Sequence, residues 1–231
     1  MSSIAEEQTE VFRKQWGLYP GQPKGLHWRD AATQELRFEK LFEYLKPGAR
    51  PISVLDVGCG GADLKGYLDK RSVDFLYTGV DLVEEMLEYA RKRYPDAALV
   101  NSDFVEVFDP SGTSFDWVVS SGVFNYQGGA TSSEWREFFF ASLSKMYELA
   151  NEAIAFNFLI DSTSYRSPNL AYFSVGEVVN FCRDNFSRHL SVAHDYPLYE
   201  CTVTVYRSNY VRQRYSGVEF QRYWVDESVS R

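Results

Sequence analysis

Short apolar runs alternate with stretches of helical periodicity through the middle of the chain. A short, apolar, β-branched run is typical of a buried strand, whereas apolar positions that recur about every 3.6 residues predict a helix. Strands are expected at residues 52–57, 75–81, 97–101, 115–121 and 154–160, and helices between them at residues 62–68, 83–94 and 135–149. This alternation of strand and helix indicates an α/β fold with a mostly parallel sheet.

Two helices are expected before the first strand. Residues 2–16 predict a short amphipathic helix. Asp30 is suited to the N-cap of a second helix, whose apolar stripe reaches Leu45 and which Pro47 and Gly48 are expected to end. These helices would form a cap beside the first strand.

Three elements are expected after the fifth strand. Ser174 and Glu177 predict a capping box for a helix at residues 175–185. Residues 189–194 and 201–206 alternate like two antiparallel strands joined as a hairpin.

The first predicted strand ends in a glycine turn, Gly58-Cys59-Gly60-Gly61, which leads into a helix. Nucleotides bind at such corners, because bare backbone lets a ligand approach closely. Gly58 and Gly60 occupy the first two positions of the dinucleotide fingerprint, but Asp63 stands at the third and Asp56 lies upstream. A pyrophosphate disfavours neighbouring carboxylates, so the pattern argues against NAD and suits a ligand with a positive charge and no phosphate. The missing Gly-Lys-Ser/Thr also excludes a P-loop.

The stretch Val54-Leu55-Asp56-Val57-Gly58-Cys59-Gly60-Gly61 resembles the first motif of the class I S-adenosylmethionine-dependent methyltransferases, and the order of elements resembles that family over residues 54–206. The resemblance implies a Rossmann-like doubly wound, mostly parallel seven-stranded sheet with an antiparallel C-terminal strand pair and N-terminal cap helices. It implies one methyltransferase domain, with the cap at residues 1–50, the core at 51–207 and an extension of unknown role at 208–231. The expected cofactor is S-adenosylmethionine, which leaves as S-adenosylhomocysteine.

Two acids carry the expected contacts to the adenosine part of this cofactor. Asp81 ends the second strand about 20 residues after the glycines, where an acid takes ribose hydroxyls. It also suits the N-cap of the next helix, and both roles can hold together. Asp103 would accept a hydrogen bond from the adenine amino group, with Phe104 beside the ring, or it is a turn aspartate.

The methionine part has one further candidate. Arg37 could pair with the methionine carboxylate, or it lies with Gln34 on a solvated helix face. The complete predicted set of cofactor-binding residues is Asp56, Gly58, Gly60, Asp81, Leu82, Met86, Asp103, Phe104, Ser121 and Arg37.

Catalytic residues are harder to identify, because a sulfonium is already activated and the protein mainly aligns the acceptor. A hydroxyl acceptor gains from a general base, usually histidine. The candidates are His27, His194 with Asp195 beside it, and more distantly Tyr126 and Tyr165. Either histidine could instead be structural or simply exposed.

The acceptor class follows mainly from what is missing. Enzymes that methylate exocyclic amines of bases or glutamine carry Asn/Asp-Pro-Pro-Tyr/Phe after the fourth strand, where this chain has Ser120-Ser121-Gly122-Val123. A net charge of −8 disfavours nucleic acid and anionic membranes as partners. Aromatic residues make up 16% of the chain and favour a small, apolar or aromatic acceptor, methylated on oxygen or nitrogen. A protein methyltransferase, a non-catalytic S-adenosylmethionine-binding module and an NAD-dependent reductase remain alternatives.

Composition sets the remaining expectations. The chain has 231 residues, 45% hydrophobic and 24% charged, within the globular range. No run approaches the roughly 20 apolar residues of a membrane span, and the first 13 residues do not resemble a signal peptide. Three scattered cysteines offer no metal-ligand spacing, so no metal is expected and a cytoplasmic location is favoured. The oligomeric state, monomer or homodimer, stays open.

Overall fold

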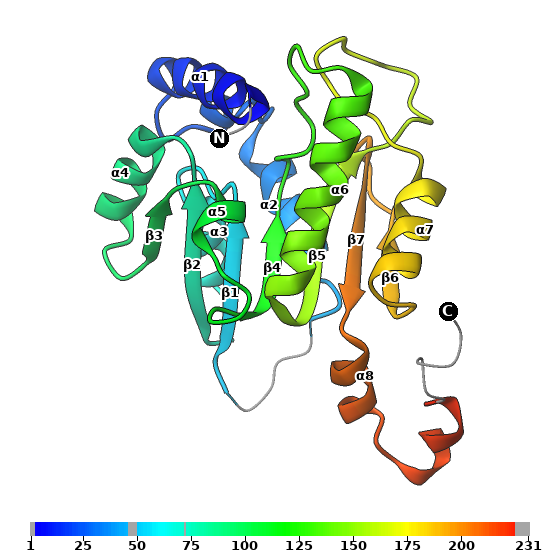
Figure 1. Ribbon diagram of the computed structural model, residues 1–231. Helices are drawn as coiled ribbons and strands as arrows, with labels where there is room; N and C mark the ends of the chain where they lie inside the picture. The colour runs from blue at the N-terminus through cyan, green and yellow to red at the C-terminus, as the bar shows by residue number, and fades with distance from the viewer. Residues whose placement is uncertain (1–2, 46–49, 72, 225–231) are drawn as a thin grey trace.

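The strands of the computed structural model form one seven-stranded sheet in the order β3-β2-β1-β4-β5-β7-β6 (Figure 1). The structure describes residues 3–45, 50–71 and 73–224. β1 to β5 are parallel, and β7 runs antiparallel to both β5 and β6. The predicted fold class is confirmed. The strands are β1 (Ile52–Val57), β2 (Phe75–Asp81), β3 (Ala98–Asn101), β4 (Phe115–Ser120), β5 (Ala150–Leu159), β6 (Leu190–Ala193) and β7 (Glu200–Tyr206).

Helices cover both faces of the sheet. The apolar stripes of α2, α3 and α4 pack on one face against Val54, Trp117 and Val119. Helices α5, α6 and α7 pack on the other face, against Leu55 and Val118. Successive side chains of a strand point to opposite faces of the sheet, so alternate residues of one strand are buried in two separate hydrophobic cores. The helices are α1 (Ser3–Leu18), α2 (Ala31–Leu41), α3 (Asp63–Leu68), α4 (Glu84–Arg93), α5 (Phe104–Val107), α6 (Ser132–Leu149), α7 (Val175–Asn185) and α8 (Ser208–Arg214), with 3-10 helices η1 (Pro23–Leu26) and η2 (Val218–Tyr223).

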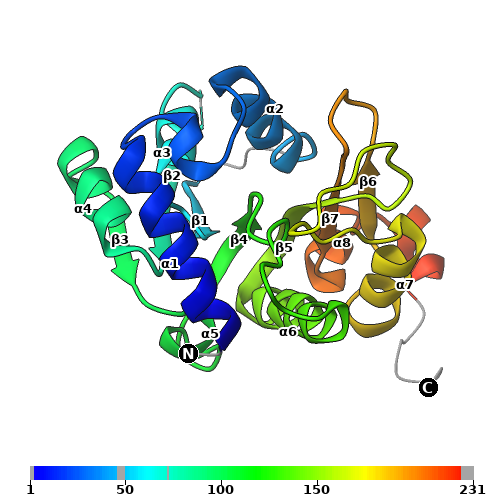
Figure 2. The ribbon, with the colours of Figure 1, turned by 90° about the horizontal axis from the view of Figure 1, so that it is seen from above.

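Helix α1 lies across the carboxyl edge of the parallel strands, as Figures 1 and 2 both show. Gln8 ties it to the loop after β4, because its Nε2 donates to the backbone oxygen of Tyr126 at 3.1 Å. Arg13 ties it to α4 through an ion pair with Glu85 at 3.0 Å. This helix therefore roofs the edge at which ligands bind in open α/β sheets.

Two predicted helix boundaries and one predicted capping box differ from the structure. α2 ends at Leu41, before the predicted end, and Pro47 and Gly48 lie outside the described residues. Ser174 is the N-cap of α7, as predicted, but the predicted capping box is wrong: the Ser174 side chain makes no cap hydrogen bond, and Glu177 pairs with Arg136 of α6. A capping box forms instead at Thr131 and Glu134, so α6 begins three residues before the predicted start.

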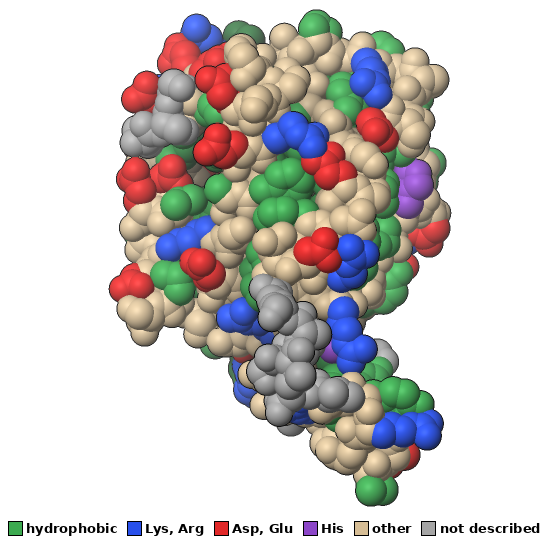
Figure 3. Space-filling view, turned by 45° about the vertical axis from the view of Figure 1, so that its right-hand side comes forward, with side chains coloured by type: hydrophobic (Ala, Val, Ile, Leu, Met, Phe, Trp, Pro, Cys, Tyr) green, Lys and Arg blue, Asp and Glu red, His purple; other side chains and the backbone are tan. Residues whose placement is uncertain are grey.

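The C-terminal extension continues from β7 as α8 and then η2. Figures 1 and 3 show this segment projecting below the body of the protein. Its apolar side chains are exposed, among them Val218 at 87% and Tyr223 at 53%. The part of the predicted extension at 225–231 lies outside the described residues.

Candidate active site

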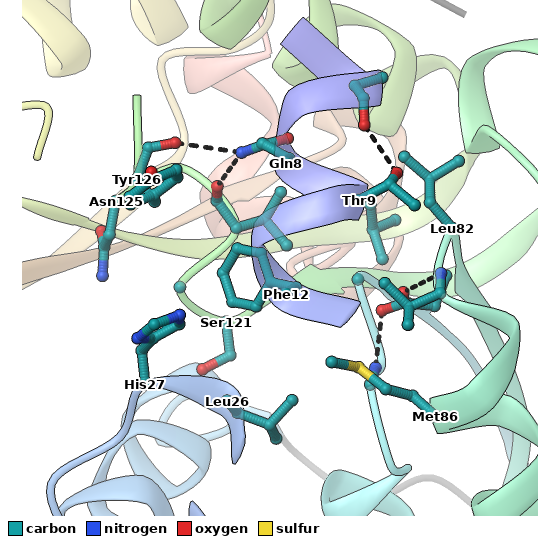
Figure 4. A pocket seen from close by; sticks show the side chains of 18 of the residues that line it. Gln8, Thr9, Phe12, Leu26, His27, Leu82, Met86, Ser121, Asn125 and Tyr126 are labelled. Atoms are coloured by element: carbon teal, nitrogen blue, oxygen red, sulfur yellow. Dashed lines mark hydrogen bonds between the residues drawn. The ribbon is translucent and has the colours of Figure 1, made fainter. Parts of the chain in front are cut away.

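A cavity of about 640 Å³ lies at the carboxyl edge of the sheet, beneath α1 (Figure 4). One end is lined by the turn after β1 and by the residues that follow β2 and β3. The other end is lined by α1, η1 and the loops that follow β4 and β5. Nine of the ten predicted cofactor-binding residues line it: Gly58, Gly60, Asp81, Leu82, Met86, Asp103, Phe104, Ser121 and Arg37.

The glycine turn at the first end is held to β2. The backbone N–H groups of Gly58 and Cys59 both donate to the carbonyl of Val80, at 2.9 and 3.1 Å. Gly58 has φ of +73°, a left-handed conformation that favours glycine, and a Cβ there would collide with Val123. The missing side chain therefore keeps the turn close to the loop after β4.

Asp81 closes the same corner from β2. Its carboxylate accepts the N–H of Gly60 at 2.8 Å and the N–H of Val83 at 2.9 Å. Val83, and not Asp81, is the N-cap of α4. Burial raises the pKa of Asp81, and the backbone hydrogen bonds oppose that shift. Each carboxylate oxygen has a second lone pair, so the group can still accept hydrogen bonds from a ligand.

Asp56, the acid of the first motif, lies outside the cavity. The side chain of Asp56 is buried beneath the turn, where it accepts a hydrogen bond from the Tyr77 hydroxyl at 2.7 Å. Burial raises its pKa to about 7. Asp56 is therefore not placed for the direct cofactor contact that the sequence predicted, because its strand position turns it toward Tyr77. Asp63 is likewise engaged elsewhere, with Arg93 and Gln34.

The acid after β3 lies where the sequence predicts it. Asp103 is the N-cap of α5, and its side chain accepts the N–H of Val105 at 3.0 Å. Phe104 is buried beside it, and both line the cavity. Behind the lining residues Ser121 and Gly122, the buried Asn157 of β5 accepts the N–H of Gly122 at 2.8 Å and donates to Ser121 Oγ at 3.4 Å. Both readings of Asp103, turn residue and ligand contact, are geometrically compatible.

Arg37 does not lie on a solvated helix face. Its Nε donates to the Glu200 carboxylate at 2.9 Å, its Nη1 donates to the carbonyl of Thr33 at 3.0 Å, and the guanidinium stacks on Trp28 at 4.2 Å. The Arg37 and Glu200 side chains are only 10% and 2% exposed, and both residues line the cavity. Three of the five guanidinium N–H groups serve Glu200 and Thr33, which leaves two for a ligand.

Aromatic rings line the far end of the cavity. His27 ends η1 in a left-handed conformation, with φ of 57°. Its ring lies parallel to that of Tyr126 and perpendicular to that of Phe12. Burial lowers the pKa of His27, which keeps the imidazole neutral at neutral pH. Two of the three predicted catalytic residues, His27 and Tyr126, are thus brought together.

The third predicted catalytic residue, His194, lies elsewhere. Its ring is exposed, is not among the residues that line the cavity, and its Nδ1 lies 2.9 Å from the carbonyl oxygen of Glu200. Asp195, expected to orient it, pairs with Lys40 at 2.8 Å. His194 is therefore not placed to act as a base on a ligand in this cavity. Tyr165 is also outside it, with 67% of its surface exposed.

Several lining residues had no signal in the sequence. Gln8 and Phe12 come from α1, and Asn125 comes from the loop after β4. An amphipathic helix and a polar loop residue match no motif, so only the packing of the chain identifies them. Among the described residues, no group of three or more His, Cys, Asp or Glu side chains could hold a metal ion. No described helix has the length and hydropathy needed to cross a membrane.

Comparisons with known proteins relate this chain to methyltransferases. The family model "Methyltransferase domain" matches residues 54–141. The Mycobacterium tuberculosis protein "Putative methyltransferase Rv1506c" is 31% identical over 164 residues, which is 70% of this chain and 96% of that protein.

Solved structures share the fold at low identity. Magnesium protoporphyrin IX methyltransferase from Synechocystis PCC 6803, with bound S-adenosylhomocysteine, has a TM-score of 0.61 and 15% identity, covering 89% of this chain and 96% of that one. Burkholderia thailandensis 1,6-didemethyltoxoflavin-N1-methyltransferase has a TM-score of 0.59 and 18% identity, covering 90% and 92%. The Mycobacterium tuberculosis relative is matched over 96% of its length, and the solved structures share the fold. The chain therefore belongs to the methyltransferases and has the class I S-adenosylmethionine-dependent fold.

Proposed function

We propose that this protein transfers a methyl group from S-adenosylmethionine to the oxygen or nitrogen of a small-molecule acceptor. The observation that carries the proposal is the continuity of the cavity. It runs from the glycine turn and Asp81 at one end to His27 and Tyr126 at the other. One chamber can therefore hold a methyl donor and an acceptor beside each other, as an in-line displacement requires.

The residues at the first end fit the donor. Asp81 can accept from ribose hydroxyls, Asp103 can accept from the adenine amino group, and Phe104 can contact the base. Gly58 and Gly60 line this end with bare backbone, and a Cβ at either position would collide with Val123 or Leu26. The two remaining N–H groups of Arg37 suit the methionine carboxylate. Asp81, the acid beside the turn that lines the cavity, matches a ligand whose sulfonium and ammonium are positive and which has no phosphate.

Methyl transfer from a sulfonium requires little catalysis from the protein's own side chains. The donor, when bound, supplies an electrophilic methyl group. The chain aligns the acceptor and excludes water under α1, which Gln8 holds in place. His27, neutral at neutral pH, can accept the proton of a hydroxyl acceptor, and Tyr126 lies beside it as a polar partner.

The form of the cavity favours a small acceptor over a protein. Its volume of about 640 Å³ lies within the usual range of small-molecule sites. The roof formed by α1 is tied to the loop after β4 by Gln8 and by Glu7, which accepts the N–H of Gly129 at 2.8 Å. A peptide would need an open groove in place of this roof.

Calorimetric titration of the full chain with S-adenosylmethionine, S-adenosylhomocysteine and, separately, NADH tests the proposal. We expect one-to-one binding of the first two and no binding of NADH. Asp81→Ala should weaken donor binding at least tenfold, because it removes the acceptor for the ribose hydroxyls and for the turn. Asp109→Ala is the matched control: Asp109 also accepts a backbone N–H, from Ser111 at 2.9 Å, but lies outside the cavity.

Two results would contradict the proposal. One is the absence of binding by either S-adenosyl compound. The other is equal loss of binding in Asp81→Ala and Asp109→Ala, which would separate Asp81 from the donor. After donor binding is established, transfer of a labelled methyl group to a panel of small acceptors identifies the substrate.

A further inference from the structure

Two aromatic rings in the acceptor end of the cavity face each other across a gap. The rings of His27 and Tyr126 are parallel to within 5°, with centroids 6.4 Å apart. Figure 4 shows Tyr126 above and His27 below. Rings in direct face-to-face contact would be about 3.5 Å apart, whereas a planar group between two rings needs about 7 Å, two contacts of about 3.5 Å each. The observed separation is close to the second value.

The third ring closes one side of this gap. Phe12 is perpendicular to His27, at 87° and 5.3 Å, and to Tyr126, at 83° and 6.2 Å. The three centroid distances form a nearly equilateral triangle, so Phe12 lies beside the gap and does not fill it. An edge-to-face contact with a ring in the gap is a favoured aromatic geometry. We call the space bounded by His27, Tyr126 and Phe12 the aromatic slot.

The polar side chain of Asn125 lies next to the slot. Asn125 precedes Tyr126, lines the same cavity and is only 9% exposed. Its Oδ1 is buried and has no hydrogen-bond partner among the described residues. Its backbone is fully engaged: its N–H donates to Gly122 and its carbonyl accepts from Ala171. A buried amide oxygen left unpaired is unfavourable, so this group is suited to a ligand.

Charge is balanced at this end of the cavity. Gln8, Phe12, His27, Asn125 and Tyr126 contribute uncharged surface, since burial keeps the imidazole of His27 neutral. The charges of Arg37 and Glu200 are paired with each other. Arg29 also lines the cavity, but its side chain is 89% exposed and lies 3.9 Å from Asp30. These lining residues therefore offer no buried, unpaired charge to a charged ligand, whereas a neutral ring would keep the walls dry.

We propose that the acceptor is a planar, uncharged aromatic or heteroaromatic ring that stacks between His27 and Tyr126 and hydrogen-bonds to the Asn125 amide through a group at its edge. This inference rests on the proposed function, because it makes the aromatic slot the place where the acceptor meets the donor. The loop from Ser121 to Tyr126 connects the glycine turn with the aromatic slot. Val123 of this loop lies against Gly58, and Tyr126 is one wall of the slot. Because the nitrogens of His27 lie in the plane of its ring, His27 is then a wall of the slot and does not take a proton from the stacked ring.

A pair of probes that share a lactam and differ in whether the bicyclic skeleton is flat and aromatic or puckered and saturated tests the slot. 2-Quinolinone is a planar bicyclic lactam, and octahydro-2-quinolinone carries the same lactam on a puckered, saturated skeleton. Each is titrated into the full chain with and without saturating S-adenosylhomocysteine, and its dissociation constant is measured by ligand-observed NMR. We expect the planar lactam to bind at least tenfold more tightly, because only it can stack on both rings.

Matched variants assign the preference to the slot. Tyr126→Leu and His27→Asn each remove one ring, and asparagine tolerates the left-handed backbone at position 27. Both should bring the ratio of the two dissociation constants to within threefold of one. Tyr126→Phe keeps the ring and should keep the ratio. Asn125→Leu should weaken both lactams several-fold and leave their ratio unchanged, because it removes the amide and not the rings.

The outcomes separate the slot from the proposed function. If S-adenosylhomocysteine binds but the two lactams bind equally, or neither binds, the slot is overturned and the methyltransferase proposal stands. If the planar preference persists in Tyr126→Leu and His27→Asn, the rings are not its cause and the slot is again overturned. If the preference depends on both rings but S-adenosylhomocysteine does not bind, the slot is an aromatic-binding site and the proposed function fails.

Discussion

The guanidinium of Arg37 and the carboxylate of Glu200, 163 residues apart in the sequence, form a buried ion pair with the Nε of Arg37 2.9 Å from both carboxylate oxygens. The pair fastens α2 of the N-terminal cap to the start of β7. Trp28 covers one face of the guanidinium. Because both side chains are nearly inaccessible, each depends on the other for compensation of its charge.

Removing one partner of this pair should destabilise the protein more than removing both. Arg37→Leu leaves the Glu200 carboxylate buried and uncompensated, and we expect it to lower the free energy of unfolding by about 3–5 kcal/mol. The double variant Arg37→Leu, Glu200→Leu should recover more than half of that loss, because no charge stays buried. Urea denaturation of the three proteins measures this. Equal stability of the single and double variants would contradict it.

The same double variant tests whether Arg37 also contacts the cofactor. If its two remaining N–H groups hold the methionine carboxylate, the folded double variant should bind S-adenosylmethionine at least tenfold more weakly than the wild type. Calorimetry on protein shown to be folded by circular dichroism gives the answer. Affinity equal to that of the wild type would limit Arg37 to joining α2 and β7.

A side chain at Gly58 should disrupt the turn. Gly58→Ala forces a left-handed backbone on alanine, which costs about 1–2 kcal/mol, and it drives a methyl group into Val123. We expect lower stability in urea and at least tenfold weaker donor binding. Gly112→Ala is the control, because nothing lies within 4 Å of a Cβ at that position and its φ is not positive. It should change stability by less than about 1 kcal/mol and leave donor binding intact.

The buried Asp56 should make stability fall as the pH rises. Its pKa is raised from 3.8 to about 7 by burial, so between these values the folded state keeps a proton that the unfolded state has released. Raising the pH therefore favours unfolding until the folded group ionises near pH 7. Relative to the wild type, Asp56→Asn should gain stability between pH 4 and pH 8, by up to about 4 kcal/mol.

Urea denaturation at pH 4, 6 and 8 measures this difference. The asparagine side chain retains an oxygen that can accept the Tyr77 hydroxyl, so the comparison isolates the charge. Tyr77→Phe is the companion variant: it removes a hydrogen bond that stabilises the ionised carboxylate and should raise the pKa of Asp56 further. A stability difference between Asp56→Asn and the wild type that does not vary with pH would show that Asp56 is ionised throughout.

His27 should titrate below the ordinary value of 6.5, because burial disfavours the imidazolium. An NMR titration of the histidine ring protons measures the midpoint, and the signal missing in His27→Asn identifies the residue. For such a group, stability falls as the pH drops below 6.5, since the unfolded state then binds the proton more readily. A midpoint above 6.5 would mean that a nearby carboxylate stabilises the charged ring and would remove the neutral base at pH 7.

The sequence predicted more of the residues at the glycine-turn end of the cavity than at the end lined by His27 and Tyr126. Gly58, Gly60, Asp81 and Asp103 follow directly after strands, and parallel strands bring their carboxyl ends to one edge, so local patterns were enough. The structure places His194 outside the lining of the cavity, and its neighbour Asp195 pairs with Lys40, a residue far away in the sequence.

Some predictions about the whole protein remain open. The three cysteines are free and buried, but a cytoplasmic location stays a prediction. The choice between a monomer and a homodimer also stays open, and so does the expectation that nucleic acid is not a partner.

Local sequence patterns by themselves determined the order of the seven strands and of helices α1 to α4, α6 and α7, the glycine turn and the acid that ends β2, because hydrophobic period, glycine and strand ends are properties of a few neighbouring residues. The tertiary structure decided which distant side chains meet. Gln8 reaches the carbonyl of Tyr126, 118 residues away, and brings Phe12 to the aromatic slot. Such contacts arise when separate elements bury their apolar faces against one another, and no local pattern records which faces will meet.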